Sequence, residues 1–331
     1  MRALIDQIEA LVHQEVGRNV GALFAAAQGG LFAAATAIAA VEKPRLGILT
    51  GFFVPAGTPP AAETDGPAGM ALLVHGLVQA GLDCRVLTDA ACETACAAAL
   101  AGAGLRDVPL DVGTAETVVS TWRAAGIDWV VSIERCGQSA DGVPRNMRGE
   151  DIGAHATLLD PIFTAGPWRT VGIGDGGNEV GMGSLPPGLI AAHVKHGAAI
   201  ACVTPADHLV MAGVSHWGAY ALLAALAVLR PDWRSGLLQA LDPVTDQAVL
   251  EALVTHGPAV DGVTLRRELT IDGVGMAVHH GKLEAIRAVV EPMTAGPRRV
   301  DIGFLDGRIT VPDDFDTMGQ DEIRRQFEGE E

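Results

Sequence analysis

The chain has 331 residues, of which 49% are hydrophobic and 19% are charged, and its formal net charge is −17. This composition excludes an intrinsically disordered chain, because such a chain buries too little apolar surface to offset the entropy lost on ordering. The negative charge argues against nucleic acid and anionic membranes as partners, since both attract clustered Lys and Arg.

The sequence predicts two helices in the first part of the chain, over residues 3–17 and 21–41. In the first, Leu4, Ile8 and Leu11 recur at helical spacing. The second has the length of a membrane span, roughly 20 residues. It consists mostly of Ala and Gly, however, and lacks the density of Leu, Ile and Phe that a span needs. We therefore expect a packed helix there.

From residue 45 onward, short apolar runs alternate with helical patterns. The predicted strands are 45–51, 84–89, 108–112, 128–134, 170–175 and 199–204. The predicted helices between and after them are 67–80, 91–103, 114–125 and 214–230. Strands joined by crossover helices predict an α/β fold with a doubly wound, mostly parallel sheet and flanking helices.

The pattern divides the chain into three segments. Residues 1–44 form an N-terminal helical segment packed on the core, and residues 45–230 form the α/β core that carries the site. Residues 231–331 form a C-terminal α+β segment, which we expect to belong to the same domain. Its predicted elements are helices at 245–255 and 278–290 and a β-hairpin around Asp306-Gly307.

The cysteines and the N-terminus bear on the compartment. The five cysteines are odd in number and lack CxxC spacing, which argues against a disulfide framework and a structural zinc site. Asp6, Glu9 and Glu15 lie where a secretory signal needs a basic segment and an apolar run. The sequence therefore predicts a cytoplasmic protein with reduced thiols.

Acidic side chains follow several of the predicted strands. In an open parallel sheet, ligands bind beyond the carboxyl ends of the strands. Single acids in such positions often cap helices, but converging carboxylates repel one another, and a divalent cation or a cationic substrate group relieves that repulsion. We therefore expect an acidic cleft at one sheet edge. The carboxylates in these loops are Glu63, Asp65, Asp89, Glu134, Asp151, Asp175 and Glu179.

Basic and nucleophilic residues lie in the same loops. Arg135, Arg145 and Arg148 carry guanidinium groups, which suit carboxylate ligands. Together with the acidic loops they match an amino dicarboxylic acid as the small-molecule partner. Cys136 has no identifiable paired histidine, so a thiol nucleophile is disfavoured. His216 remains open as a base or as a core residue.

Taken together, these motifs resemble the D-glutamate cyclase C-terminal domain family. The GDGGNEVGMG element is the most specific of them. The chain differs from the family pattern at Cys136, where the family often has Pro. The matching pieces are LTGF at 49–52, ETDGPAG at 63–69, TD at 88–89, ERCG at 134–137, NMRGEDI at 146–152, GIGDGGNEVGMG at 172–183, VSHWGAY at 214–220 and VDGVT at 260–264.

The resemblance implies dehydration of D-glutamate to 5-oxo-D-proline, a hydro-lyase reaction assisted by Mn²⁺ or Mg²⁺. Either Glu179 or Glu134 would act as the base, and either Arg135 or Arg148 would hold the α-carboxylate. The expected metal ligands are Glu63, Asp65 and Asp175. The expected catalytic residues are Asp175, Glu179, Glu134 and Asn178. The residues expected to bind the substrate are Arg135, Arg148, Asn146, Gly51 and Thr50.

Two other functions fit the same residues. One is another metal-dependent enzyme acting on a small amino acid or carboxylate, such as an epimerase or an amide hydrolase. The other is a non-catalytic metabolite-binding protein. The sequence leaves open the handedness of the substrate, the metal and the oligomeric state.

Overall fold

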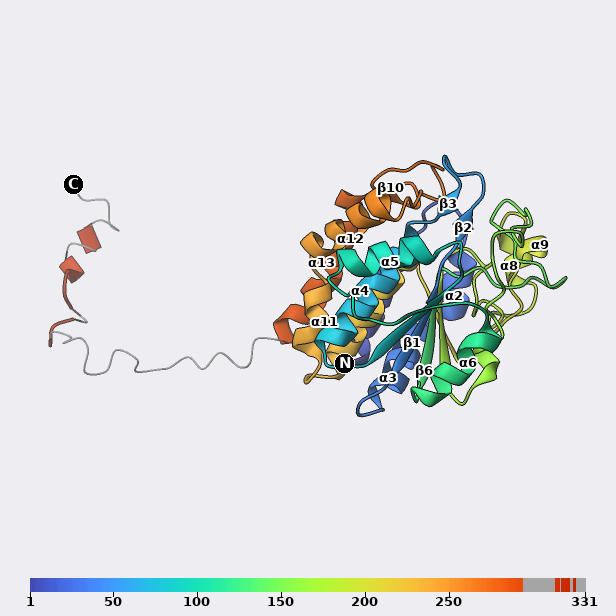
Figure 1. Cartoon of the computed structure of the whole chain (residues 1–331). Coiled ribbons are helices and arrows are strands. Elements are labelled where there is room, and N and C mark those ends of the chain that lie inside the picture. Colours follow the sequence, from blue (N-terminus) through green and yellow to red (C-terminus); the bar gives the residue numbers. More distant parts are fainter. Residues whose placement is uncertain (294–312, 316, 322–323, 326–331) are drawn as a thin grey trace. The chain divides into compact units, whose positions relative to one another are not determined.

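Six parallel strands form the centre of the fold (Figure 1). The computed structural model describes residues 1–293, 313–315, 317–321 and 324–325. The strands lie in the order β5-β4-β1-β6-β7-β8, and each neighbouring pair is parallel. This arrangement confirms the predicted α/β fold. The strand bounds are β1 (Leu46–Thr50), β4 (Cys84–Thr88), β5 (Leu110–Val112), β6 (Trp129–Ile133), β7 (Arg169–Gly174) and β8 (His208–Met211).

Helices cover both faces of the sheet, as the alternating side chains of β1 show. Ile48 packs in the cluster that includes α4 (Asp65–Gln79) and α5 (Glu93–Gly102), whereas Leu49 packs with Trp122 of α6 (Ala115–Ala124). Gly47 lets α6 approach, because a Cβ atom there would lie 2.2 Å from the Trp122 ring. Along the chain, β4 and β5 are added on one side of β1, whereas β6, β7 and β8 are added on its other side. The winding direction therefore reverses between β1 and β6, and sheets of this class bind ligands at that point.

Helix α10 (Ser215–Leu229) lies at the centre of the helices that cover one face of the sheet. Almost all of its side chains are buried, which is typical of a helix that is apolar on every side. It packs against α4, against α1 (Arg2–Val12) and α3 (Gly30–Ala39), and against α11 (Arg234–Ala240) and α13 (Met276–Val290). Because α10 follows β8 directly, its N-terminus lies at the carboxyl edge of the sheet.

The N-terminal region differs in detail from the prediction. The first helix ends at Val12, and the expected helix over residues 21–41 is broken into α2 (Gly21–Ala27) and α3, bent by 41°. Gly29 stands at the break with a φ of 87°, a conformation that favours glycine. Within the described residues, no single helix has the length and hydropathy of a membrane span, and only the bent pair meets both when taken together.

The strand predicted at 199–204 is wrong. This segment begins in the short helix α9 (Gly197–Ile200) and continues as a loop, and the sixth strand is formed by His208–Met211 instead. Ile200 and Cys202 pack with α2 and α8 (Leu189–His193) beside the sheet. Short apolar runs of a loop and of a buried strand have the same pattern, so the periodicity could not separate them.

The remaining elements surround the carboxyl edge and the outer helical layer. Helix α12 (Pro243–His256) packs on α5 and α4. The hairpin expected around Asp306-Gly307 lies outside the described residues. The chain divides into two units at residue 294, and the elements named here belong to the first. The other elements are β2 (Phe53–Val54), β3 (Ala61–Ala62), α7 (Ile162–Ala165), β9 (Thr270–Ile271), β10 (Val274–Gly275) and η1 (Glu291–Met293).

Candidate active site

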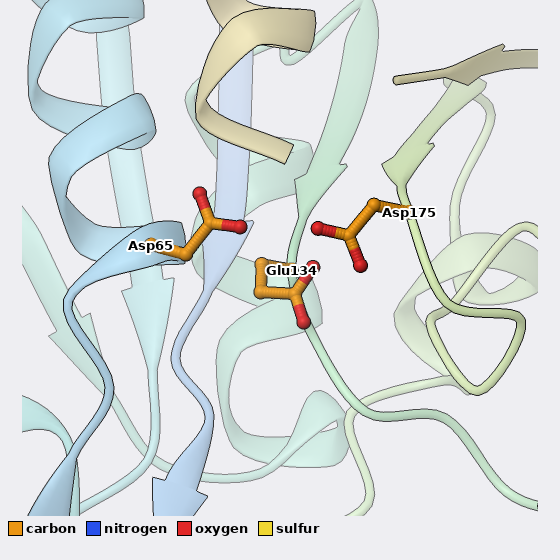
Figure 2. Close-up of side chains that lie close together, drawn as sticks. All are labelled: Asp65, Glu134 and Asp175. Carbon is orange, nitrogen blue, oxygen red and sulfur yellow. The ribbon is translucent and has the colours of Figure 1, made fainter. Parts of the chain in front are cut away.

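Three buried carboxylates meet at the carboxyl edge of the sheet (Figure 2). Asp65 is the first residue of α4, Glu134 follows β6, and Asp175 follows β7. Oxygen atoms of the three groups lie within 4.8 Å of one another. They gather beside the point between β1 and β6 where the winding direction reverses, which is where a ligand site is expected in this fold. We call these three residues the carboxylate cluster.

The first turn of α10 binds the carboxylate cluster. The backbone N–H of Ser215 donates to Asp65 Oδ2 and to Asp175 Oδ2, each at 3.0 Å, and that of His216 donates to Asp65 Oδ1 at 2.6 Å. The Ser215 hydroxyl donates to Glu134 Oε2 at 2.5 Å. The N-terminus of a helix carries partial positive charge and unpaired N–H groups, so it stabilises carboxylates placed there.

Arg18 supplies a full positive charge to the same region. Its Nη2 lies 2.5 Å from Asp272 Oδ1, and its Nη1 lies 3.4 Å from Asp175 Oδ2. Burial lowers the pKa of Arg18, but the charges of Asp175 and Asp272 outweigh burial and raise it well above its usual value. Arg18 lies in the turn between α1 and α2, and Asp272 lies in the turn between β9 and β10. The sequence patterns did not single out either residue.

A pocket with a volume of about 240 Å³ opens beside the cluster. It is smaller than the range of roughly 300–1,000 Å³ typical of sites for drug-sized ligands, so it suits a small metabolite. Its polar lining consists of Arg18, Glu63, Glu134, Asn146, Arg148 and Asp272. The rest of its lining consists of Phe52, Phe53, Val54, Pro55, Ala56, Met147, Gly262 and Val263.

Burial raises the pKa of every carboxyl group in the cluster. It raises the pKa of Asp65 to about 7 and the pKa values of Glu134 and Asp175 well above their usual range. The charges of Glu179 and Asp65 raise the pKa of Glu134 further. The pKa of Glu63, which lies in the pocket wall, is also raised well above its usual value, first by burial and then by the negative charge of Asp272. The site therefore favours protons or another cation between its carboxylates.

Arg135, one of the expected substrate-binding residues, binds other parts of the protein and does not line the pocket. Arg135 donates to Asp89 Oδ2 at 2.6 Å, to Gly51 O at 2.7 Å and to the carbonyl of Thr157, and it is buried. Its guanidinium thus joins three segments of the sheet edge. Among the two arginines expected to hold a substrate carboxylate, Arg148 is the one that lines the pocket.

Glu179, expected as a base, shapes the glycine-rich loop instead. Its Oε1 accepts hydrogen bonds from the N–H groups of Asp175 at 3.0 Å and Gly176 at 2.6 Å. Its Oε2 accepts from the N–H of Gly177 at 2.6 Å. These contacts order the backbone that carries Asp175, and they leave Glu134 as the expected acid–base residue that faces the pocket.

Three further expected residues also form internal hydrogen bonds. Thr50 donates to Ile133 O at 2.8 Å, and the Asn178 amide donates to Arg145 O at 2.8 Å. The Asn146 side-chain oxygen accepts from the N–H groups of residues 148 and 150, each at 3.0 Å. Asn146 therefore orders the loop that presents Arg148, and unlike Thr50 and Asn178 it also lines the pocket.

The cluster is also the arrangement of acidic residues that fits a metal ion. The sequence predicted Glu63, Asp65 and Asp175 as ligands, whereas the structure brings Asp65 and Asp175 together with Glu134. Glu63 faces the pocket. Carboxylate oxygens are the donors that Mg²⁺ and Mn²⁺ prefer, so the donor set is chemically suitable.

The raised pKa of Asp65 makes the stability of the metal-free protein depend on pH. Its pKa rises from 3.8 to about 7 on folding, so between these values the folded state binds the proton more tightly. By linkage, the free energy of unfolding falls as pH rises through this window. We expect a melting temperature that is lower near pH 7 than near pH 5 in a chelator, with a weaker dependence in Asp65→Asn. One pKa unit corresponds to about 1.4 kcal/mol, so the difference between the two proteins should exceed about 1 kcal/mol. Equal slopes would contradict this assignment.

Replacing Cys136 with Ser should leave activity close to wild type. The thiol is buried, lies outside the pocket lining and donates to Arg145 O at 3.3 Å, and burial raises its pKa well above its usual value. Such a thiol is a poor nucleophile, and a serine hydroxyl keeps the donor. Measurement of kcat/KM and melting temperature checks this, and complete loss of turnover in a folded variant would indicate covalent catalysis.

The doubly wound sheet and the buried carboxylates at its carboxyl edge define an α/β protein with an acidic pocket. The chain belongs to the D-glutamate cyclase-like family of C-terminal domains, whose sequence model matches residues 8–287. It is 29% identical over 283 residues to the Homo sapiens protein named D-glutamate cyclase, mitochondrial. The alignment covers 75% of this chain and 46% of the human protein, so the chain spans about half the length of that relative.

Proposed function

We propose that the pocket binds D-glutamate and converts it to 5-oxo-D-proline and water. The observation that carries the proposal is the pairing of arginines with buried carboxylates of raised pKa around one small pocket. Membership of the D-glutamate cyclase-like family and the name of the human relative support the same substrate. The enzyme would then be a hydro-lyase.

The reaction joins the α-nitrogen to the carbon of the γ-carboxylate and removes one oxygen of that carboxylate as water. The ammonium group loses two protons, and both leave on the expelled oxygen, so the reaction needs no other reactant. Because nitrogen and carbon belong to one molecule, holding them in the right geometry contributes to the rate, with roughly 7–11 kcal/mol as the upper range for ideal alignment. The remaining obstacle is electronic, since a carboxylate is a poor electrophile.

Charged residues of the pocket would make the γ-carboxylate a better electrophile. Arg148 lies at the exposed side of the pocket and would bind the α-carboxylate. Arg18 and Glu134 would face the γ-carboxylate. Burial and the charges of neighbouring carboxylates raise the pKa of Glu134 well above its usual range, which favours its protonated form, so Glu134 would donate a proton to the departing oxygen. A carboxylate of the pocket wall would accept the proton that the nitrogen loses.

A divalent metal ion fits the proposal at the carboxylate cluster. Asp65, Glu134 and Asp175 would hold it, and with the ion bound Glu134 would serve as a ligand in place of a proton donor. A bound Mn²⁺ or Mg²⁺ would supply a Lewis acid that neutralises the γ-carboxylate and stabilises the oxyanion. Arg18 contributes one positive charge to the same cluster in any case.

The proposal is tested by incubating the purified chain with D-glutamate or L-glutamate in Mn²⁺, in Mg²⁺ or in a chelator. Products are separated by chiral chromatography. We expect 5-oxo-D-proline from D-glutamate and a much slower reaction with the L-enantiomer. Formation of L-glutamate from D-glutamate would indicate an epimerase, and binding without turnover would indicate a metabolite-binding protein. Either result would overturn the proposed reaction.

A further inference from the structure

Glu63 is a buried carboxylate in the pocket wall without a protein partner. It is 6% exposed and lines the pocket. Among the residues that the structure describes, none forms a hydrogen bond or an ion pair with its carboxylate. It also does not cap the neighbouring helix, because Thr64 is the N-cap of α4 and no side chain caps that end. Burying a charged group without a partner costs free energy, and a cationic ligand in the pocket would offset that cost.

Asp272 lines the same pocket and also has an unsatisfied carboxylate oxygen. Its Oδ1 is bound by Arg18, but its Oδ2 is buried and has no hydrogen-bond partner. Of the charged groups around Glu63, Asp272 acts on it most strongly. The backbone of Asp272 has a φ of 56°, which is uncommon for a residue other than glycine and marks a conformation that the surrounding structure imposes.

The position of Glu63 is fixed by close contact with the backbone of Gly262. A Cβ atom at residue 262 would lie 1.8 Å from Glu63 Oε1. The backbone N–H of Glu63 donates to Phe52 O at 2.7 Å, which anchors the residue on the other side. The carboxylate is therefore held against one wall of the pocket by the loop that follows Val260.

We infer that Glu63 and Asp272 form the subsite that binds the α-ammonium group of the substrate. This assignment rests on the proposed function and names the residues that recognise the amine. An ammonium group donates three hydrogen bonds, and Glu63 and Asp272 place two carboxylates in the wall of the pocket. The neighbouring wall of Phe52, Val54 and Val263 is apolar, which suits the carbon chain of an amino acid.

This subsite is distinct from the carboxylate cluster. The oxygens of Asp65 and Asp175 are held by the first turn of α10, whereas Glu63 and Asp272 Oδ2 have no such donors. A metal ion needs about six oxygen ligands, and an ammonium group needs three acceptors. The two carboxylate oxygens of Glu63 and Oδ2 of Asp272 match the second requirement.

The test compares D-glutamate with glutarate, which has the same two carboxylates but no amine. Binding to each is measured by titration calorimetry in a chelator for the wild type, Glu63→Gln, Gly262→Ala and Glu268→Gln. Gly262→Ala keeps every charge but displaces the Glu63 carboxylate, and the atom it meets is the far end of a flexible side chain. Glu268→Gln is the matched control, since Glu268 lies in the loop that contains Gly262 but does not line the pocket.

We expect Glu63→Gln and Gly262→Ala to weaken binding of D-glutamate by roughly tenfold or more, because a charge-assisted hydrogen bond is lost. Binding of glutarate should stay unchanged or improve, and Glu268→Gln should alter neither. The inference is overturned if binding of both ligands weakens equally or if D-glutamate binding is unaffected. It is also overturned if a separate titration without the chelator shows that Glu63→Gln abolishes binding of Mn²⁺ while D-glutamate still binds. If the wild type binds D-glutamate without turning it over, the proposed reaction fails and the same variants still decide the subsite.

Discussion

Glu134→Gln is expected to lower the rate of 5-oxoproline formation by roughly a hundredfold or more, with little change in melting temperature. Glutamine keeps the size of the side chain and can still accept the hydrogen bond from Ser215, but it cannot transfer a proton. Loss of one group that stabilises the developing charge costs about 2.7–4 kcal/mol in comparable sites. The φ of 44° at Glu134 is a strained conformation of the kind found at functional sites.

The control for Glu134→Gln is Glu116→Gln, an identical change at an exposed position in the first turn of α6. It should leave the rate unchanged. Initial rates and thermal unfolding are measured on the same preparations. A folded Glu134→Gln enzyme with the wild-type rate would remove Glu134 from the reaction, and an unfolded one would assign it to stability.

Arg18→Met is expected to destabilise the metal-free protein by about 3–5 kcal/mol, because it removes one partner of a buried ion pair and leaves the other uncompensated. Arg18 is 16% exposed and Asp272 only 1% exposed, so solvent screens this pair weakly. Arg18 is also close to Asp175, so its loss leaves the cluster with less positive charge.

A double-mutant cycle with Asp272→Asn separates the ion pair from packing. If the charge is the cause, Arg18→Met with Asp272→Asn should be more stable than Arg18→Met alone, as measured by urea unfolding. The effect of Arg18→Met should also shrink as pH falls, because burial raises the pKa of Asp175 and its protonation removes a charge that Arg18 compensates. A single Arg18→Met variant as stable as the wild type would contradict this account.

The sequence predicted the parts of the site that follow strands. Glu134 and Asp175 each come directly after an apolar strand, and Asp65 lies at the end of the loop that follows the first strand. Parallel strands present such residues at one edge. Their approach within 4.8 Å follows from the strand order, which local patterns do not specify. The choice between Arg135 and Arg148 was open for the same reason, since the sequence did not show that Asp89 binds Arg135.

Sequence patterns could not identify Arg18 and Asp272 as residues of the site. Arg18 precedes every strand, and Asp272 belongs to an Asp-Gly turn whose usual meaning is a chain reversal. Tertiary packing brings both beside Asp175, and neither has a local signal of that contact. The role of Gly262 beside Glu63 is hidden in the same way, because it depends on the close approach of two distant segments.

The most direct test of the account is a crystal structure of Glu134→Gln grown with D-glutamate, since this variant should bind the substrate without consuming it. We expect D-glutamate in the pocket, with its amino group against Glu63 and Asp272, its α-carboxylate on Arg148, and its γ-carboxylate facing residue 134 and Arg18. A ligand bound elsewhere, or one whose amino group points away from Glu63, would contradict the proposed site.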